Sequence, residues 1–228
     1  MTLTRKLTAE FLGTAGLLTV VVGSGIMGER LAGGNVAIVL LANSLATGAG
    51  LVFLIYGFAN ISGAHFNPVV TLTETFRGNL KWSDCGLYCV IQILGAFSGV
   101  GLANLMFGLP AFFASAKIRE GNAQFLGEFI ATFGLIAVIR TGVKFQLNLV
   151  PVLVACYITA AYWFTSSTSF ANPAVTLARS VSDTFAGIAP SSVPMFIIAQ
   201  LFGALAAMIV FDWLLKEESE NGWKKERY

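Results

Sequence analysis

Long apolar runs alternate with short polar segments along most of the chain. About 20 apolar residues are needed for a helix to cross roughly 30 Å of hydrocarbon. Six runs meet that length and predict spanning helices at 7–28, 36–58, 83–107, 123–140, 147–167 and 193–215. Two further apolar stretches, 67–77 and 172–182, are too short to span. The pattern therefore predicts an all-α membrane protein with six spans and two shorter helices.

The composition supports a membrane protein and excludes several other classes. Hydrophobic residues make up 56% of the 228 residues and charged residues 11%, whereas soluble domains carry about 25% charge. The net charge of +2 is small, so nucleic acid is not an expected partner. The three cysteines lie inside apolar runs with no metal-site spacing. We expect no metal, no cofactor and no enzymatic activity.

The distribution of Lys and Arg predicts how the chain is oriented in the membrane. Cytoplasmic loops are enriched in these residues. Ten of the fourteen fall on the side that also carries both chain ends: Arg5, Lys6, Arg77, Lys81, Arg140, Lys144, Lys216, Lys224, Lys225 and Arg227. Both termini are therefore expected in the cytoplasm, which agrees with an even number of spans.

The two halves of the chain carry the same features in the same order, which indicates an internal repeat. The first span of each half contains a Glu-Phe segment, at 10–17 and 128–135. An Asn-Pro motif follows the second span, at 65–72 and 170–177, and the third span contains a Gln-x-x-Gly-Ala segment, at 92–96 and 200–204. Three spans are an odd number, so the second copy must be inverted, as in many transport folds. We expect one domain over 1–228, with repeats at about 7–107 and 123–215 and a cytoplasmic tail at 216–228.

Each Asn-Pro motif predicts the start of a re-entrant half-helix. Asparagine is a favoured N-cap, and proline suits the first helical position. Asn67-Pro68 and Asn172-Pro173 would each begin a helix of about ten residues, which covers roughly 15 Å. Two such helices entering from opposite faces meet at the midplane, where their positive N-terminal dipoles repel cations. The Asn67 and Asn172 amides can donate hydrogen bonds to a neutral solute.

Two acidic residues lie inside apolar spans, where a charge is costly and indicates a role. Glu10 and Glu128 occupy matching positions in the two repeats. Each could accept hydrogen bonds from backbone amides in the half-helix loop of its own repeat. The alternative is a proton-coupling carboxylate in an ion-coupled secondary transporter.

The two Asn-Pro motifs resemble the signatures of the aquaporin, or major intrinsic protein, family. Residues 62–71 are similar to the first signature, and 170–174, which include Ala174, to the second. The similarity extends over about 7–215. It implies the six-span, two-half-helix fold, a homotetramer with one pore per subunit, surrounding lipid, and a bacterial-type member in the inner (plasma) membrane. It also agrees with the loop-supporting role for Glu10 and Glu128.

The family's selectivity filter consists of four residues, one of them usually an arginine directly after the second Asn-Pro-Ala. The resemblance places Val175 at that position. Spacing from the motifs places the other three at Thr47, Ala160 and Ser169. All four are small, so a wider opening than that of a strict water pore is expected.

Three further residues near the motifs bear on the pore. Val69 stands where alanine is usual and either narrows the constriction or packs away from it. His65 is expected as a hydrogen-bonded loop histidine by the cytoplasmic half of the pore. Arg179 follows Val175 by one helical turn, so it could place a charge in the outer vestibule. The simpler interpretation is an arginine that snorkels to the interface or pairs with Asp183.

The predicted function is a passive channel for small uncharged solutes such as glycerol, urea or metalloid acids like arsenite, with or without water. A strict water channel and an ion-coupled transporter are the alternatives. A membrane scaffold without transport is a third class. The paired half-helices favour a channel over the transporter and the scaffold.

Overall fold

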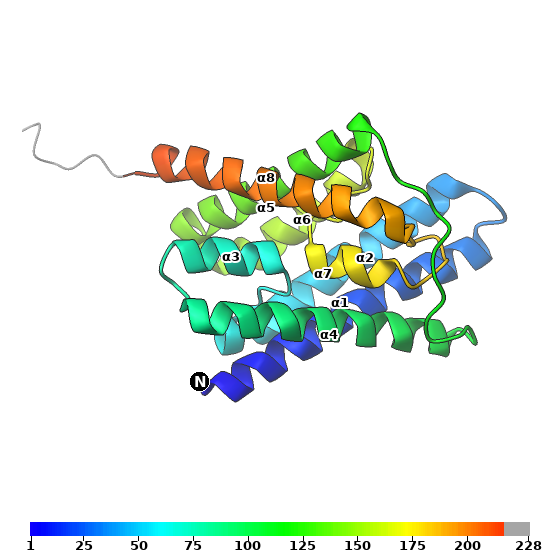
Figure 1. Ribbon diagram of the computed structural model, residues 1–228, viewed down its shortest axis with the longest axis horizontal. Helices are drawn as coiled ribbons and strands as arrows, with labels where there is room; N and C mark the ends of the chain where they lie inside the picture. Colours follow the sequence, from blue (N-terminus) through cyan, green and yellow to red (C-terminus); the bar gives the residue numbers. More distant parts are fainter. Residues whose placement is uncertain (217–228) are drawn as a thin grey trace, which may run out of the picture.

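The computed structural model in Figure 1 describes residues 1–216 and contains no β-strand within them. The predicted residues 217–228 of the tail lie outside the described part. The helices are α1 Leu3–Leu31, α2 Val36–Ser62, α3 Pro68–Phe76, α4 Trp82–Met106, α5 Asn122–Phe145, α6 Val150–Phe164, α7 Pro173–Arg179 and α8 Val193–Leu214. Short 3-10 turns precede α6 and α8 at Leu147–Leu149 and Pro190–Ser192.

Six helical segments within the described residues are long and apolar enough to cross a membrane, which confirms the predicted fold class. The span predicted to end at 140 runs on to Phe145. Arg140 does not end it, because its Nη2 donates to Asp212 Oδ1 on α8 at 2.5 Å. The ion pair lets the helix continue past a charge that would otherwise favour an end.

The two half-helices lie end to end, with their N-termini facing each other in the middle of the bundle (Figure 1). Asn67 caps α3 by accepting from Val69 N, and Asn172 caps α7 by accepting from Ala174 N and Val175 N. The first half-helix has nine residues, close to the prediction, but α7 has only seven. It ends at Arg179 because the chain turns at Ser180, whose hydroxyl donates to Leu177 O at 2.7 Å.

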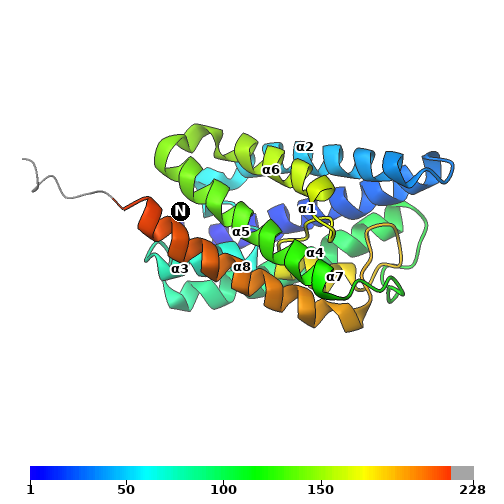
Figure 2. The ribbon, with the colours of Figure 1, turned by 90° about the horizontal axis from the view of Figure 1, so that it is seen from above.

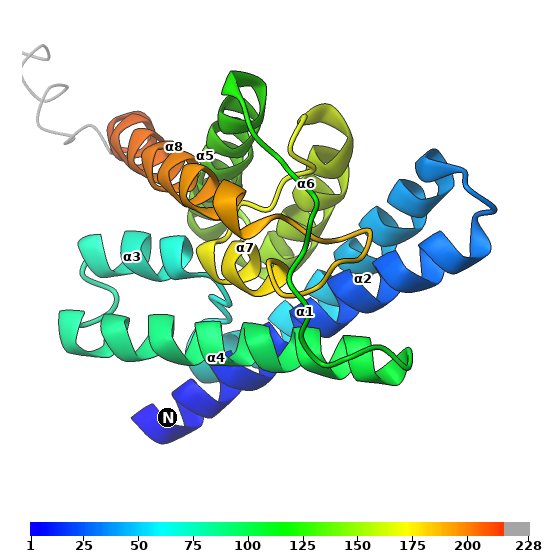
Figure 3. The ribbon, with the colours of Figure 1, turned by 45° about the vertical axis from the view of Figure 1, so that its right-hand side comes forward.

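Helices α4 and α8 flank the two half-helices, as Figure 3 shows, and both contact both half-helices. Two close crossings in matching positions of the repeats pair α1 with α4 and α5 with α8. A Cβ at Gly99 would collide with the carbonyl of Ala15, and a Cβ at Gly203 with that of Phe129. Glycine is therefore required at both crossings for the backbones to approach.

Both ends of the described chain lie at the same end of the bundle (Figure 2). The start of α1 and the last turn of α8 are there, together with the C-terminal end of α3. Many large apolar side chains on the spanning helices are exposed, among them Leu45, Phe53, Leu94, Leu105 and Ile209. Such a surface is typical of helices that face lipid or neighbouring subunits.

Candidate functional site

A cavity of about 450 Å³ runs between the helices and past the N-termini of both half-helices. Asn67 and Asn172 line it where the half-helices meet. His65 and Glu74 line the part beside α3, and Arg179 lines the part beside α7. The cavity therefore runs alongside both half-helices and passes the point where their N-termini meet.

The two Asn-Pro motifs are joined by a reciprocal pair of hydrogen bonds across the cavity wall. Asn67 Nδ2 donates to Ala171 O, and Asn172 Nδ2 donates to Phe66 O, each at 2.8 Å. The side-chain oxygens of both asparagines are occupied by backbone N–H groups at the start of the half-helices. An amide nitrogen carries two hydrogens, so each asparagine keeps a second donor beside the cavity.

The loops that lead into the half-helices adopt a backbone conformation that needs external support. Ala64 and Phe66 in one loop have positive φ angles, and so do Ser169 and Ala171 at the matching positions of the other. A non-glycine residue held there costs about 1–3 kcal/mol, so the surrounding structure must hold it in place.

That support in the first loop comes from Glu10, which is fully buried. Its Oε1 accepts from Ser62 Oγ at 2.6 Å and from His65 N at 3.0 Å. Its Oε2 accepts from Phe66 N at 2.7 Å and from Gln92 Nε2 at 2.8 Å. Four hydrogen bonds to one carboxylate stabilise the charge and fix the loop.

Glu128 makes the equivalent contacts in the second loop and is also fully buried. Its Oε1 accepts from Phe170 N at 2.8 Å, while Oε2 accepts from Ala171 N at 2.9 Å and from Gln200 Nε2 at 2.6 Å. Neither glutamate lines the cavity. Both therefore shape the pore loops without facing a solute.

Two glutamines complete this network, and sequence reasoning did not assign them a role. Gln92 Nε2 also donates to Thr71 Oγ1 at 2.9 Å, and Gln200 Nε2 to Thr176 Oγ1 at 2.8 Å. Each glutamine thus connects the buried glutamate of its repeat to the half-helix that follows. The repeated Gln-x-x-Gly-Ala segment was the signal that could have identified them.

Four side chains of different character line the cavity on the α7 side of the asparagines: Thr47, Tyr162, Ser169 and Val175. Thr47 Oγ1 and Tyr162 Oη share a hydrogen bond of 3.1 Å. Ser169 Oγ is buried and has no hydrogen-bond partner among residues 1–216. The residue itself forms part of the cavity wall.

The prediction that Ala160 belongs to this group is wrong. Ala160 is exposed and does not line the cavity, whereas Tyr162 is buried and does. Successive helical residues are about 100° apart, so two residues separate nearly opposite faces of α6. The loop between α6 and the second Asn-Pro motif shifts the register, and a phenol occupies the place expected for a methyl group.

The simpler interpretation of Arg179, a snorkelling or Asp183-paired residue, is also wrong. Its exposed fraction is 2%, and it lines the cavity. Its Nε donates to Ala186 O, and its Cζ lies 3.4 Å from the centroid of the Phe170 ring. Asp183 instead accepts from Ser115 Oγ and Ala116 N. The guanidinium is thus fixed beside the cavity, one turn beyond Val175.

The sequence left open whether Val69 narrows the constriction or packs away from it. Val69 is fully buried and does not line the cavity, while Val70 does. Val69 therefore belongs to the packing core and does not narrow the passage. His65 lines the cavity, and its Nδ1 lies 3.1 Å from Thr71 Oγ1.

The loop that connects α4 to α5 supports the α7 side of the cavity from outside. Arg119 Nε donates to Gly187 O at 3.0 Å, and its Cζ lies 5.2 Å from the Phe170 ring centroid. Burial lowers the pKa of the Arg119 guanidinium from its ordinary value. Phe170 is thus contacted by two arginines, Arg119 and Arg179, which fixes its ring near the second motif.

Six spanning helices around a central cavity, with two half-helices meeting at its middle, define a membrane channel. The family model described as "Major intrinsic protein" matches residues 1–162 and 143–226. The chain belongs to that family, which is a family of channels and not of enzymes.

The comparisons with individual proteins agree with this membership. The chain is 52% identical to the aquaglyceroporin AqpS of Rhizobium meliloti, over 94% of this chain and 91% of that protein. It is 31% identical to a probable glycerol uptake facilitator protein of Thermotoga maritima, over 56% of this chain and 60% of the relative. The structure of the aquaglyceroporin from Plasmodium falciparum has the same fold, with a TM-score of 0.74 at 21% identity, covering 94% and 97% of the two chains.

Proposed function

We propose that the chain is a passive channel for small uncharged solutes larger than water, with glycerol as the representative. The proposal rests on the residues that line the α7 side of the cavity. The lining of the α7 side combines apolar Val175 and the Tyr162 ring with the polar residues Ser169 and Arg179. A polyol has hydrocarbon and hydroxyl groups, and such a lining can contact both. The relatives named for glycerol transport support the same solute class.

Exclusion of ions would follow from the charges at the middle of the passage. Two helix N-termini point at the same place, and each favours negative over positive charge. The second N–H of each asparagine amide is available there as a donor. The Arg179 guanidinium adds a fixed positive charge toward one mouth. Hydronium and metal cations are therefore repelled, while a neutral solute exchanges hydrogen bonds along the lining.

The pore is narrower than the four small filter residues predicted from the sequence would have made it. Tyr162 occupies the place expected for Ala160, and Arg179 reaches the same part of the cavity. Urea and neutral metalloid acids such as arsenous acid remain within the proposed solute class, because they are small, uncharged and rich in hydrogen-bonding groups. Water is expected to pass as well.

The ion-coupled transporter fits the structure less well. A coupling carboxylate must exchange protons with the transport path, but Glu10 and Glu128 are fully buried and absent from the cavity lining. Glu10 accepts four hydrogen bonds, two of them from backbone N–H groups. Protonation would break this network and release the strained loops. Both glutamates are therefore proposed as loop supports.

We further propose the bacterial plasma membrane as the location, with both termini in the cytoplasm. The excess of Lys and Arg on the side of the chain ends supports this orientation. A homotetramer with one pore per subunit, surrounded by lipid, is proposed from the family resemblance. The exposed apolar side chains of the spanning helices are suited to lipid and to neighbouring subunits.

The test is solute-driven swelling of proteoliposomes that contain the purified chain. Water, glycerol, urea and arsenite are compared with protein-free vesicles of the same lipid. We expect faster swelling with glycerol and with at least one of the other two solutes. Acceleration of water flux alone would refute the proposed solute class.

A further inference from the structure

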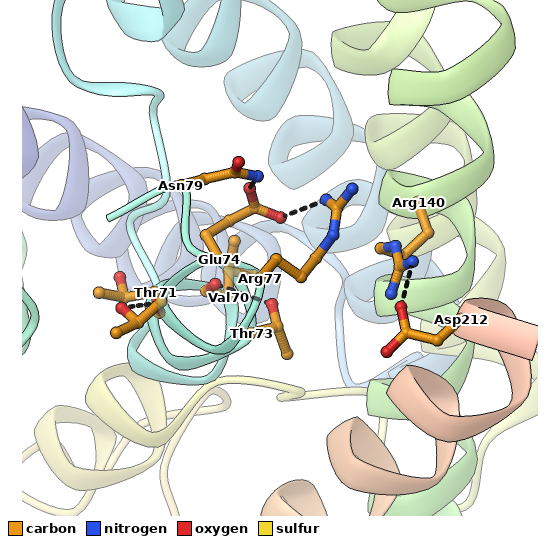
Figure 4. A network of polar contacts seen from close by, with 9 residues as sticks. Val70, Thr71, Thr73, Glu74, Arg77, Asn79, Arg140 and Asp212 are labelled. Atoms are coloured by element: carbon orange, nitrogen blue, oxygen red, sulfur yellow. Dashed lines mark hydrogen bonds and ion pairs between the residues drawn. The ribbon is translucent and has the colours of Figure 1, made fainter. Parts of the chain in front are cut away.

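Two side chains with a full charge line the cavity formed by residues 1–216, Glu74 in the part beside α3 and Arg179 in the part beside α7. The acid already has partners. Glu74 Oε1 accepts from Arg77 Nη1 at 3.0 Å, and Oε2 accepts from Asn79 Nδ2 at 2.6 Å. Figure 4 shows the carboxylate between these two side chains. The Arg77 charge therefore offsets that of Glu74, and an anion in the cavity meets little repulsion there.

Arg179 is in neither of the two ion pairs found within residues 1–216. Its Nε donates to Ala186 O, and the face of the guanidinium lies against the Phe170 ring, with Cζ 3.4 Å from the centroid. Its Nη1 and Nη2 make no hydrogen bond with residues 1–216 and, unlike Nε and Nη1 of Arg140, they are not fully buried. Since Arg179 lines the cavity, the edge of the guanidinium is open to it.

A second arginine raises the positive potential at the same place. Arg119 Cζ lies 5.2 Å from the Phe170 ring centroid, and its side chain donates to backbone carbonyls and not to a carboxylate. Glu128 supports the same loop but is fully buried and does not line the cavity. A negative group beside Arg179 would therefore meet positive charge that no ion pair neutralises, in a site where water is partly excluded and attraction is strong.

The polar groups on the α7 side match a solute that carries both a carboxylate and a hydroxyl. The two parallel N–H groups at the edge of a guanidinium fit the two oxygens of a carboxylate. Thr47 Oγ1 and Tyr162 Oη line the same part of the cavity and share a hydrogen bond of 3.1 Å. That bond uses one hydroxyl hydrogen and one lone pair, so the pair can still bond a hydroxyl of the solute.

We propose that a small hydroxycarboxylate such as glycerate binds at the Arg179 guanidinium and passes through the channel as the anion. Glycerate is glycerol with a carboxylate in place of one hydroxymethyl group, so it suits a passage that admits glycerol. The second N–H of each asparagine amide can donate to its oxygens at the middle of the cavity. The inference rests on the proposed solute channel and adds a charged solute class to it.

The test measures uptake of radiolabelled glycerate and glycerol by the same proteoliposomes at a pH of about 8, where a carboxylic acid is ionised. One arm applies a potassium diffusion potential, positive inside, and the other applies none. Wild type should take up glycerate faster than protein-free vesicles do, and faster still with the potential. Glycerol uptake should not respond to the potential, because glycerol carries no charge.

Variants of Arg179 test the binding site. Arg179→Gln should lower the ratio of glycerate uptake to glycerol uptake about tenfold, as expected for loss of one charge-assisted hydrogen bond. Arg179→Lys keeps the charge without the paired donors, so the ratio should fall less. Arg30→Gln is the matched control, because it removes the same charge from the last turn of α1, outside the cavity lining. Its ratio should equal that of wild type.

The proposal is overturned if glycerol enters wild-type vesicles while glycerate enters no faster than it enters protein-free vesicles. Glycerate uptake that ignores the potential would also overturn it, since only the neutral acid would then pass. An unchanged ratio in both Arg179 variants would refute the binding site. If Arg179→Gln does not fold, the wild-type arms and Arg179→Lys still decide. Exclusion of glycerol as well as glycerate by wild type would refute the proposed function itself.

Discussion

Replacement of Glu128 by glutamine keeps the side-chain volume but removes the charge that supports the second pore loop. The native carboxylate accepts from Phe170 N, Ala171 N and Gln200 Nε2 at 2.8, 2.9 and 2.6 Å. Glutamine has one acceptor oxygen and one donor nitrogen. At least one of the three N–H groups must therefore face another donor.

The cost can be worked from these contacts. One buried donor left unpaired costs about 1–3 kcal/mol, and each of the two remaining bonds weakens by about 1 kcal/mol when its acceptor becomes neutral. Relief of the buried charge offsets part of this, so a net loss of about 2–4 kcal/mol is expected. The loss acts on a loop in which Ser169 and Ala171 already have positive φ angles.

Glu128→Gln is therefore expected to lower the thermal unfolding temperature and to reduce glycerol permeability about tenfold or more, since roughly 1.4 kcal/mol corresponds to a factor of ten. The assays are thermal unfolding of the purified protein and glycerol-driven swelling of proteoliposomes. Glu120→Gln removes the same charge from an exposed position in the loop just before α5 and should change neither. Wild-type swelling and an unchanged unfolding temperature for Glu128→Gln would refute the loop-support role.

Three further substitutions test other parts of the account. Ser169→Ala should leave stability unchanged, because the hydroxyl has no partner within residues 1–216, yet it should lower glycerol permeability relative to water in swelling assays. Arg179→Ala should admit larger polyols such as sorbitol and cost about 2 kcal/mol of stability through the lost contact with Phe170. Unchanged selectivity would count against a role for Arg179 in restricting the solute path. Gly203→Val should destabilise the protein by about 3 kcal/mol or more in chemical unfolding, because its Cβ would collide with a carbonyl of α5. Gly57→Val, where no atom lies within 4 Å of the added Cβ, is the matched control and should fold normally.

The spans and the half-helices could be predicted because their signals are local. Apolar run length and an Asn-Pro start each depend on a short stretch of sequence, and the internal repeat needs only a comparison of the two halves of the chain. The matching positions of Glu10 and Glu128 predicted hydrogen bonds to the two loops, and both glutamates make such bonds in the structure. A buried carboxylate needs hydrogen-bond donors, and in each repeat the backbone N–H groups of the loop before the half-helix supply them.

The lining of the α7 side could not be predicted as well, because it depends on helix rotation and on loop length. Ala160 was assigned by counting back from the second motif, and an error of two residues turns α6 almost to its opposite face. The sequence left open whether Arg179 lies in the outer vestibule or at the interface beside Asp183, and burial of an arginine is costly. The structure offsets that cost with the Ala186 carbonyl and the Phe170 ring, and neither contact has a sequence signal.

Glycerol flux measured with and without a proton gradient distinguishes a passive channel for small neutral solutes from a coupled transporter. The same proteoliposomes are loaded at equal pH and at unequal pH, and radiolabelled glycerol is followed to equilibrium. For a passive channel we expect rapid equilibration to the same internal concentration in both cases. Accumulation of glycerol above the external concentration only when the gradient is present would contradict it.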